Sequence, residues 1–280
     1  MILVTGASGN VGSEMVSICE RKGIHCIAAG RKNRWRNYKH AEYRYLDFED
    51  HASYEACRGV TAVFLVRPPQ VSNIQKSIAP FLRACKEYGV EKIVFLSILG
   101  VEKLPFVPHF AIEKEILRRG LAHTFLRAGF FMQNLSTTHA REIRERNELV
   151  APCGKGKTTF IHARDIAGIG IKALCGEIKD ESLDVAGEDT LTYNEVAKKL
   201  SQVLNRKITY RSPPVIAFIL YRLRHGTPFK FALIMVGIYM PTRFGAAEFH
   251  GTTKVADYLG RKPVGFDDFL REEKEIWVHR

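Results

Sequence analysis

The chain has 280 residues, of which 46% are hydrophobic and 26% are charged. This length and composition are ordinary for a globular protein with a substantial core, and they argue against a disordered chain. The formal net charge of +12 suits an anionic ligand such as a nucleotide phosphate. The basic clusters at residues 31–36 and 141–146 are not interleaved with aromatic residues in a nucleic-acid-reading motif, so nucleic acid is not an expected partner.

Short apolar runs alternate with longer amphipathic segments through the first half of the chain, which is the pattern of βαβ units. Strands are predicted at residues 2–4, 26–29, 43–46, 62–66, 93–96 and 124–126. Helices are predicted at residues 11–21 and 110–119. A third helix would carry an apolar stripe at spacings of three and four, formed by Ile74, Ile78, Phe81, Leu82 and Cys85. We therefore expect an α/β fold with a doubly wound parallel sheet over residues 1–130.

After residue 130 the alternation loosens, which indicates a smaller C-terminal α/β lobe over residues 131–280 that mainly binds substrate. Residues 158–175 are predicted to return to the first domain. Asp165 is expected to cap a helix ending near residue 175, and Thr192 and Glu195 form a capping box for another helix. Apolar segments at residues 215–223 and 229–240 are too short to cross a bilayer, so no transmembrane segment is predicted. We expect helices that pack over a pocket, with peripheral membrane contact as the alternative.

The six cysteines are widely spaced and form no Cys-x-x-Cys pair. Metal sites need closely spaced ligands, and disulfides are typical of exported chains. The first residues run directly into a structured motif without an export signal. The sequence therefore predicts a reduced, cytoplasmic protein without a bound metal.

The strongest chemical signal is the segment VTGASGNVG at residues 4–12, placed between the first strand and the first helix. Glycine permits a tight turn and close approach of backbone N–H groups to a pyrophosphate, and the helix N-terminus adds a favourable dipole. In this context the pattern predicts a Rossmann site for a nicotinamide dinucleotide. The residues predicted to contact the cofactor there are Thr5, Gly6, Ser8, Gly9, Asn10, Val11 and Gly12.

The end of the second strand indicates which dinucleotide binds. An NAD enzyme usually places a carboxylate there to bind the ribose 2′-hydroxyl, whereas this chain has Arg31, Lys32 and Arg34. Arginine holds a 2′-phosphate by charge-assisted, bidentate hydrogen bonds, so NADP(H) is favoured over NAD(H). Asp47, at the end of the third strand, is predicted either to contact the adenine amino group or to cap the following helix.

Several segments together resemble the NmrA-like family of atypical short-chain dehydrogenases. They are TGASGNVG at residues 5–12, GR at 30–31, LD at 46–47, FLRAGFFMQN at 125–134, IHARDIA at 161–167 and LTYNEVA at 191–197. Bacterial members of this type are similar to NAD(P)H-dependent quinone or azo-dye reductases. The family also includes redox-sensing regulators that bind the dinucleotide, act through protein contacts and catalyse nothing.

The expected catalytic tyrosine of short-chain dehydrogenases is missing. Phe110 stands where the tyrosine of Tyr-x-x-x-Lys would be, and a phenyl ring transfers no proton. Resemblance to lysine-retaining reductases implies that Lys114 binds the nicotinamide ribose or supplies a proton, and His109 is a candidate acid. Alternatively, Lys114 is a solvated surface residue and His109 a helix cap. The trio of Phe130, Phe131 and Met132 would either stack on a flat substrate or form core.

The predicted function is NADPH-dependent hydride transfer to a quinone-like or other conjugated small-molecule acceptor. A non-catalytic dinucleotide-sensing regulator with a protein partner is the alternative. A sugar-nucleotide epimerase shares the glycine pattern, but the missing tyrosine counts against it. The sequence does not exclude a homodimer.

Overall fold

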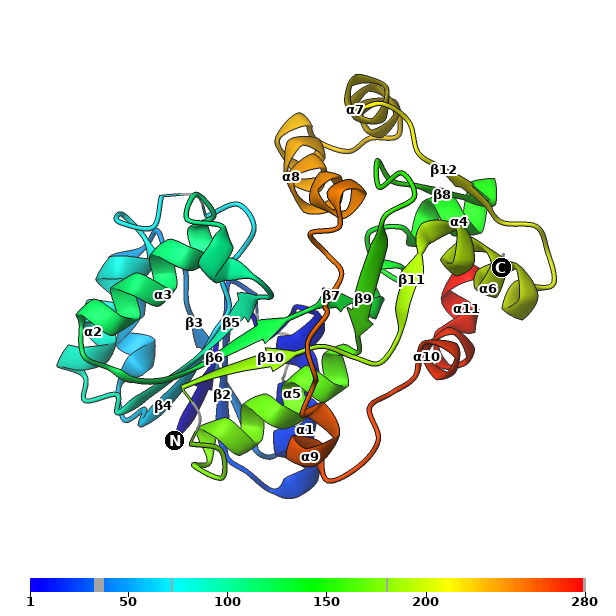
Figure 1. Cartoon of the computed structure of the whole chain (residues 1–280). Helices are drawn as coiled ribbons and strands as arrows, with labels where there is room; N and C mark the ends of the chain where they lie inside the picture. The colour runs from blue at the N-terminus through cyan, green and yellow to red at the C-terminus, as the bar shows by residue number, and fades with distance from the viewer. Residues whose placement is uncertain (33–37, 72, 180, 279–280) are drawn as a thin grey trace. The chain divides into compact units, whose positions relative to one another are not determined.

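The computed structural model describes residues 1–32, 38–71, 73–179 and 181–278 (Figure 1). The described chain divides into two compact units. The first comprises residues 1–128, 163–185 and 254–260, and the second comprises residues 129–162, 186–253 and 261–280. The returning segment is thus 163–185 rather than the expected 158–175. Strand β10 (Ser182–Val185) in this segment pairs with β6 (Ala122–Ala128) of the first unit, whereas residues 158–161 pair with strands of the second unit.

The first unit is built on a parallel sheet with the strand order β10-β6-β5-β4-β1-β2-β3. All of its strand pairs are parallel. The order reverses at β1, which is the topology of a doubly wound Rossmann fold. The strands are β1 (Ile2–Val4), β2 (Cys26–Gly30), β3 (Ala41–Tyr45), β4 (Ala62–Leu65), β5 (Lys92–Ile98), β6 (Ala122–Ala128) and β10 (Ser182–Val185).

Helices cover both faces of this sheet (Figure 1). One face carries α1 (Asn10–Lys22), α5 (Ala163–Leu174) and α9 (Val255–Leu259). The other carries the 3₁₀ segment η1 (His51–Cys57), α2 (Ile78–Glu87) and α3 (Pro108–Arg118), and a short turn η2 (Val101–Lys103) precedes α3. Because the central strands are covered on both sides, runs such as Ala62–Leu65 are buried at every position.

Two helix starts differ from their predicted positions. Ile74 is buried, as its place in the apolar stripe required, but α2 begins only at Ile78. Pro80 explains the delay, because proline is tolerated only in the first turn of a helix. Helix α5 begins at Ala163, which places Asp165 inside the first turn rather than at the cap. The other predicted strands and helices are confirmed to within about two residues.

The second unit combines two small sheets with a set of helices. Its three-stranded sheet has the order β11-β9-β7, and β12 pairs in parallel with β8. The strands are β7 (Phe130–Phe131), β8 (Glu148–Val150), β9 (Lys157–Ile161), β11 (Thr190–Thr192) and β12 (Thr209–Arg211). The helices are η3 (Met132–Asn134), α4 (Ala140–Arg146), α6 (Tyr193–Leu204), α7 (Val215–Arg224), α8 (Phe229–Tyr239), η4 (Met240–Phe244), α10 (Phe266–Glu272) and α11 (Lys274–Trp277).

The predicted capping box is confirmed at the start of α6. The Thr192 hydroxyl accepts from the Glu195 N–H, and the Glu195 carboxylate accepts from the Thr192 N–H at 2.8 Å. Within the described ranges, every helix falls short of the length and apolar character that a membrane crossing requires.

Candidate functional site

The glycine turn lies between β1 and α1, at the carboxyl edge of the parallel sheet. Gly6 has a φ of +60°, a left-handed conformation that glycine adopts without a steric penalty. The Gly9 N–H donates to the Gly6 carbonyl at 2.8 Å, and Gly9 caps α1 without a side-chain hydrogen bond. The first N–H groups of α1 therefore have no side-chain acceptor in this turn, which is how a helix N-terminus is prepared for an anion.

The position of Gly12 explains why a third glycine is needed. A β-carbon built there would lie 2.3 Å from the Gly6 carbonyl oxygen and 2.8 Å from the Gly6 carbonyl carbon. The turn therefore packs backbone against backbone at the start of α1. Ser8 is exposed beside the turn, Asn10 is half-buried, and Val11 is buried in the core beneath it.

Thr5 has a structural role. Its buried hydroxyl donates to the Phe64 carbonyl at 3.0 Å and accepts from the Val66 N–H at 2.8 Å. This side chain therefore ties the end of β1 to the end of β4, and its proton is already engaged. Any contact of Thr5 with a phosphate would have to come from its backbone.

Arg31 and Lys32 follow β2 at the same sheet edge, and both are exposed. Within the described ranges, no carboxylate forms an ion pair with either side chain. The Tyr43 hydroxyl donates to the Gly30 carbonyl at 2.9 Å and fixes the end of β2 just before the two cations. Arg34, the third predicted cation, lies outside the described residues.

Asp47 is the acidic residue of this edge. Its Oδ1 accepts from the Glu49 N–H at 3.0 Å, so one carboxylate oxygen caps the turn after β3. The residue that caps η1 is instead Asp50, which accepts from the Ala52 N–H. The helix-capping alternative is therefore wrong for Asp47, and the adenine contact stays a prediction.

Helix α3 carries the residues predicted for catalysis. Lys114 is exposed, and its Nζ lies 4.7 Å from the centre of the Phe110 ring, one turn earlier. The His109 ring stacks against Phe95 of β5, with ring centres 6.0 Å apart. Burial, with a contribution from the Arg67 guanidinium, lowers the pKa of His109 to about 3. The imidazole is therefore neutral near pH 7 and carries no imidazolium proton, which argues against the predicted role of His109 as the acid.

A hydrogen-bonded group beneath α3 was not foreseen from the sequence. The buried Glu113 carboxylate accepts from the Ser97 hydroxyl at 2.6 Å and from Arg127 Nη2 at 2.8 Å. Ser97 lies on β5 and Arg127 on β6, so three elements meet at one carboxylate. The sequence feature that could have indicated this group is a polar residue near the carboxyl end of each of the two apolar strands, where ligand sites of such sheets lie.

Arg67 is a second unforeseen residue at this edge, two residues after β4. Its Nη1 donates to the carbonyls of Pro68, Pro69 and Val71, at 3.2, 3.1 and 2.8 Å. The guanidinium thus fixes the loop after β4 and brings a positive charge close to His109.

In the second unit Phe130, Phe131 and Met132, the three residues predicted to contact substrate, are divided between core and half-buried positions. Met132 is only 1% exposed and belongs to the core, which is the second of the two predicted alternatives, and its side chain cannot stack on a ligand. Phe130 is half-buried against Tyr239 and Phe160, with ring centres 5.3 and 5.8 Å away. Phe131 is half-buried and pairs with Ile161 across β7 and β9. Substrate contact by Phe130 and Phe131 stays a prediction.

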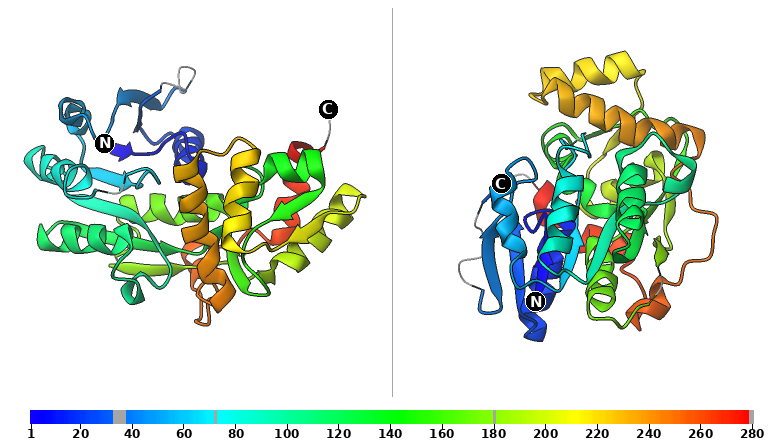
Figure 2. Two further views of the ribbon diagram at one scale, coloured as in Figure 1. Left: turned by 90° about the horizontal axis from the view of Figure 1, so that it is seen from above. Right: turned by 90° about the vertical axis from the view of Figure 1, so that its left-hand side faces the viewer.

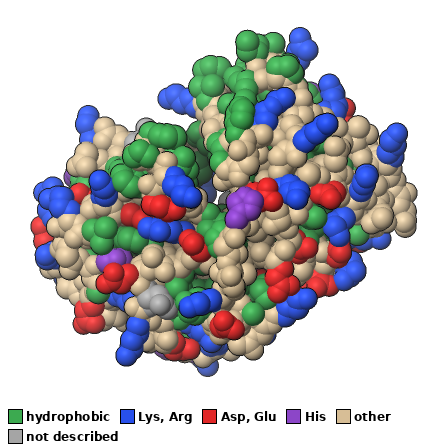
Figure 3. All heavy atoms as spheres, viewed as in Figure 1, with side chains coloured by type: hydrophobic (Ala, Val, Ile, Leu, Met, Phe, Trp, Pro, Cys, Tyr) green, Lys and Arg blue, Asp and Glu red, His purple; other side chains and the backbone are tan. Residues whose placement is uncertain are grey.

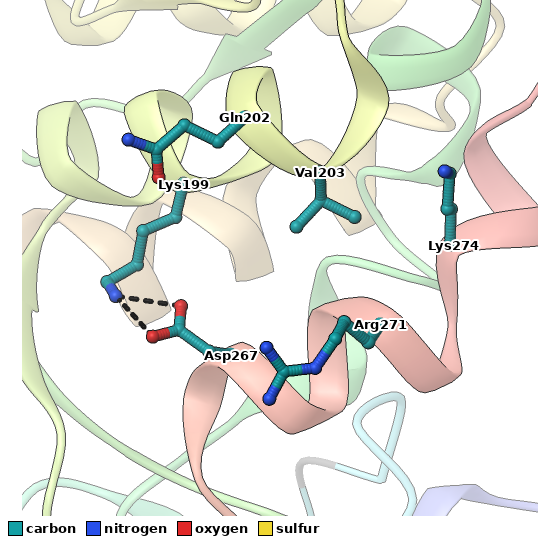
Figure 4. A pocket seen from close by; sticks show the side chains of 6 residues that line it. All are labelled: Lys199, Gln202, Val203, Asp267, Arg271 and Lys274. Carbon is teal, nitrogen blue, oxygen red and sulfur yellow. Dashed lines mark hydrogen bonds and ion pairs between the residues drawn. The ribbon is translucent and has the colours of Figure 1, made fainter.

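A surface pocket in the second unit lies between α6 and the helices α10 and α11 (Figure 4). Its walls are charged, and the Lys199 ammonium lies 2.7 and 2.8 Å from the two carboxylate oxygens of Asp267. It includes no predicted site residue, and the charges of Lys199 and Asp267 are paired with each other. Within the described ranges, His, Cys, Asp and Glu side chains form no group of three that could hold a metal.

The parallel sheet and the glycine turn before α1 define a Rossmann-type α/β protein. The NmrA-like family model matches residues 1–259, and the chain belongs to this family. An NAD(P)H azoreductase of Xenophilus azovorans is 31% identical over 224 residues, covering 75% of this chain and 76% of the relative.

Two solved structures share the fold. The NADP(H) complex of a Citrobacter sp. triphenylmethane reductase has a TM-score of 0.84 at 21% identity, covering 97% of this chain and 99% of that one. The NADPH complex of an Escherichia coli quinone oxidoreductase has a TM-score of 0.83 at 20% identity, with the same coverage of both chains.

Proposed function

We propose that this protein is an NADP(H)-dependent oxidoreductase that transfers a hydride to a quinone-like or other conjugated acceptor. The observation that carries the proposal is the close-packed glycine turn, which offers backbone N–H groups at the start of α1. The names of the similar proteins support the same class, because they specify reductases of azo compounds, triphenylmethanes and quinones with NAD(P)H or NADP(H).

The residues around the turn fit a dinucleotide. The N–H groups of Asn10 and Val11 would hold the pyrophosphate. Glycine is needed at position 12, because a β-carbon there would force the turn apart. Arg31 and Lys32 would hold the 2′-phosphate, which favours NADP(H) over NAD(H). Lys114 would bind the nicotinamide ribose. When bound, the reduced cofactor supplies the hydride.

The acceptor class follows from the proton donors that α3 offers. The Phe110 ring cannot transfer a proton, and the half-buried imidazole of His109 is neutral near pH 7. The Lys114 ammonium is the remaining donor on this face of the helix. A conjugated acceptor spreads the negative charge that it receives and needs little acid help, whereas a simple ketone needs a strong acid at its oxygen. The missing tyrosine also argues against epimerase chemistry.

The test is oxidation of NADPH by the purified protein with a panel of quinones and one azo dye, together with NADPH affinity. Turnover well above the protein-free rate is the expected result. Lys114→Ala should lower the rate at least about tenfold. Lys22→Ala is the matched control. It removes a lysine at the C-terminal end of α1, away from the glycine turn, and should have no effect on the rate.

An unchanged rate in Lys114→Ala would remove this lysine from the mechanism while leaving the reductase in place. Tight NADPH binding without turnover of any acceptor would contradict the reductase and favour the dinucleotide-sensing regulator.

A further inference from the structure

Residues 215–244, which comprise α7, α8 and η4, form a feature that the proposed reductase does not use; we call it the α7–α8 hairpin. Its two longer helices are joined by residues 225–228 and lie side by side in both views of Figure 2. They have 10 and 11 residues, far below the ~20 that a bilayer crossing needs.

The hairpin carries most of the exposed apolar side chains of the described chain. Seven of 13 exposed large hydrophobic residues lie in it, with Ile216 75% and Phe244 77% exposed. Figure 3 shows hydrophobic side chains gathered over the region of α7 and α8. On α7 they recur at spacings of four and three, so they share one helix face. The seven are Ile216, Leu220, Leu223, Phe229, Leu233, Ile238 and Phe244.

The opposite face of the hairpin is already fixed to its own unit. Arg222 Nη1 lies 2.8 Å from the buried Glu142 carboxylate, and its Nη2 donates to the Val150 carbonyl at 3.1 Å. The Tyr239 hydroxyl lies 2.6 Å from Nε2 of the buried His139. These contacts hold α7 and α8 against α4 and β8. The exposed apolar face is therefore the outer side of an anchored element.

The exposed charged residues of the hairpin itself are all positive. No aspartate or glutamate occurs in residues 196–247. Arg224, Lys230 and Arg243 are exposed on the hairpin itself. The lysines and arginines of the carboxylate-free stretch are Lys198, Lys199, Arg206, Lys207, Arg211, Arg222, Arg224, Lys230 and Arg243. An apolar helical element whose own exposed charges are all positive complements an anionic lipid surface, although Glu148 of β8 accepts from the Tyr221 hydroxyl of α7 at 3.4 Å.

We propose that the α7–α8 hairpin docks on the surface of an anionic lipid bilayer. Its apolar side chains enter the boundary between headgroups and acyl chains, and Arg224, Lys230 and Arg243 contact headgroup phosphates. A symmetric contact with a second copy would bring the same cations together without a carboxylate on either hairpin to pair with them. The inference does not depend on the proposed reductase activity.

The test is co-sedimentation of the full-length protein with vesicles of phosphatidylcholine alone or mixed with phosphatidylglycerol. We expect binding to the anionic vesicles that falls as salt is raised. Leu220→Glu combined with Leu233→Glu should weaken it at least about tenfold, and Lys230→Gln about fivefold. Leu117→Glu, at a 52% exposed leucine of α3, is the control and should bind normally.

Circular dichroism would establish that each variant is folded, and Lys230→Gln provides a surface variant if the double substitution unfolds the hairpin. Equal binding to both vesicle types, or to neither, would overturn the proposal. The proposal would also be overturned if the protein sediments as a dimer and Leu220→Glu makes it a monomer, because a second copy would then occupy this face.

Discussion

At the scale of single residues, Gly12 is the most constrained position of the candidate site. Replacing it with alanine places a β-carbon against the Gly6 carbonyl, so the turn must open. We expect Gly12→Ala to weaken NADPH binding at least about tenfold, measured by fluorescence titration. Gly237→Ala on α8 is the matched control, because its β-carbon meets nothing within 4 Å. Unchanged affinity in Gly12→Ala would contradict a pyrophosphate at this turn.

Arg31 is the residue that should select the cofactor. Arg31→Glu replaces a phosphate-binding cation with a carboxylate suited to a ribose hydroxyl. Affinity for NADPH should fall by roughly 10- to 100-fold, with a much smaller change for NADH. Lys22→Glu makes the same charge change at the far end of α1 and should alter neither affinity. Equal losses for both cofactors would refute the assignment of Arg31 to the 2′-phosphate.

At the scale of elements, the Glu113 carboxylate joins α3 to β5 and β6. Glu113→Ala leaves the partly buried Arg127 without its nearest carboxylate and Ser97 without its acceptor. Because Arg127 is 21% exposed, we expect a moderate loss of about 2 kcal/mol in the free energy of unfolding, measured with urea. Glu102→Ala removes an exposed partner 3.5 Å from Arg127 and should cost less than about 0.5 kcal/mol. Similar effects of the two substitutions would contradict this anchoring role.

Elements and site were predictable from the sequence to different degrees. The local order of the residues identified the strands by their apolar runs and the turn by its three glycines, because both features depend on neighbouring positions. It could not reveal that Ser97, Glu113 and Arg127 meet, because three separate elements bring them together. Nor could it show that His109 lies against Phe95 with Arg67 nearby, which makes its imidazole neutral. Local patterns thus located the glycine turn, whereas the protonation of His109 depends on tertiary packing.

At the scale of the whole molecule, buried histidines should make stability depend on pH. The pKa of His109 is about 3 in the folded protein, below its ordinary value near 6.5, so the unfolded chain binds the proton more readily. Burial also lowers the pKa of His139, although the neighbouring Glu142 opposes this. The contribution of these two histidines to the free energy of unfolding is present above about pH 6.5. It is lost as the pH falls toward their pKa values in the folded protein.

Between pH 7.5 and pH 5, His109 should account for a loss of about 2 kcal/mol in unfolding free energy. His109→Gln should show a correspondingly smaller decrease in urea unfolding. His250→Gln, at an exposed histidine, should behave as the unsubstituted protein does. If His109→Gln and the unsubstituted protein lose stability equally over this range, the histidine is not the group responsible.

The division of the first unit into three chain segments has a consequence during synthesis. Residues 1–128 emerge first, but α5 and β10 follow only after a segment of the second unit has been made. Gly170 of α5 packs against Met15, Leu126 and Phe64, so the part of this face beside α1 stays uncovered until α5 is made. A ribosome that has released only the first 130 residues therefore presents an incomplete, apolar sheet. The nascent chain should need chaperone protection at this stage, and a fragment ending there should aggregate.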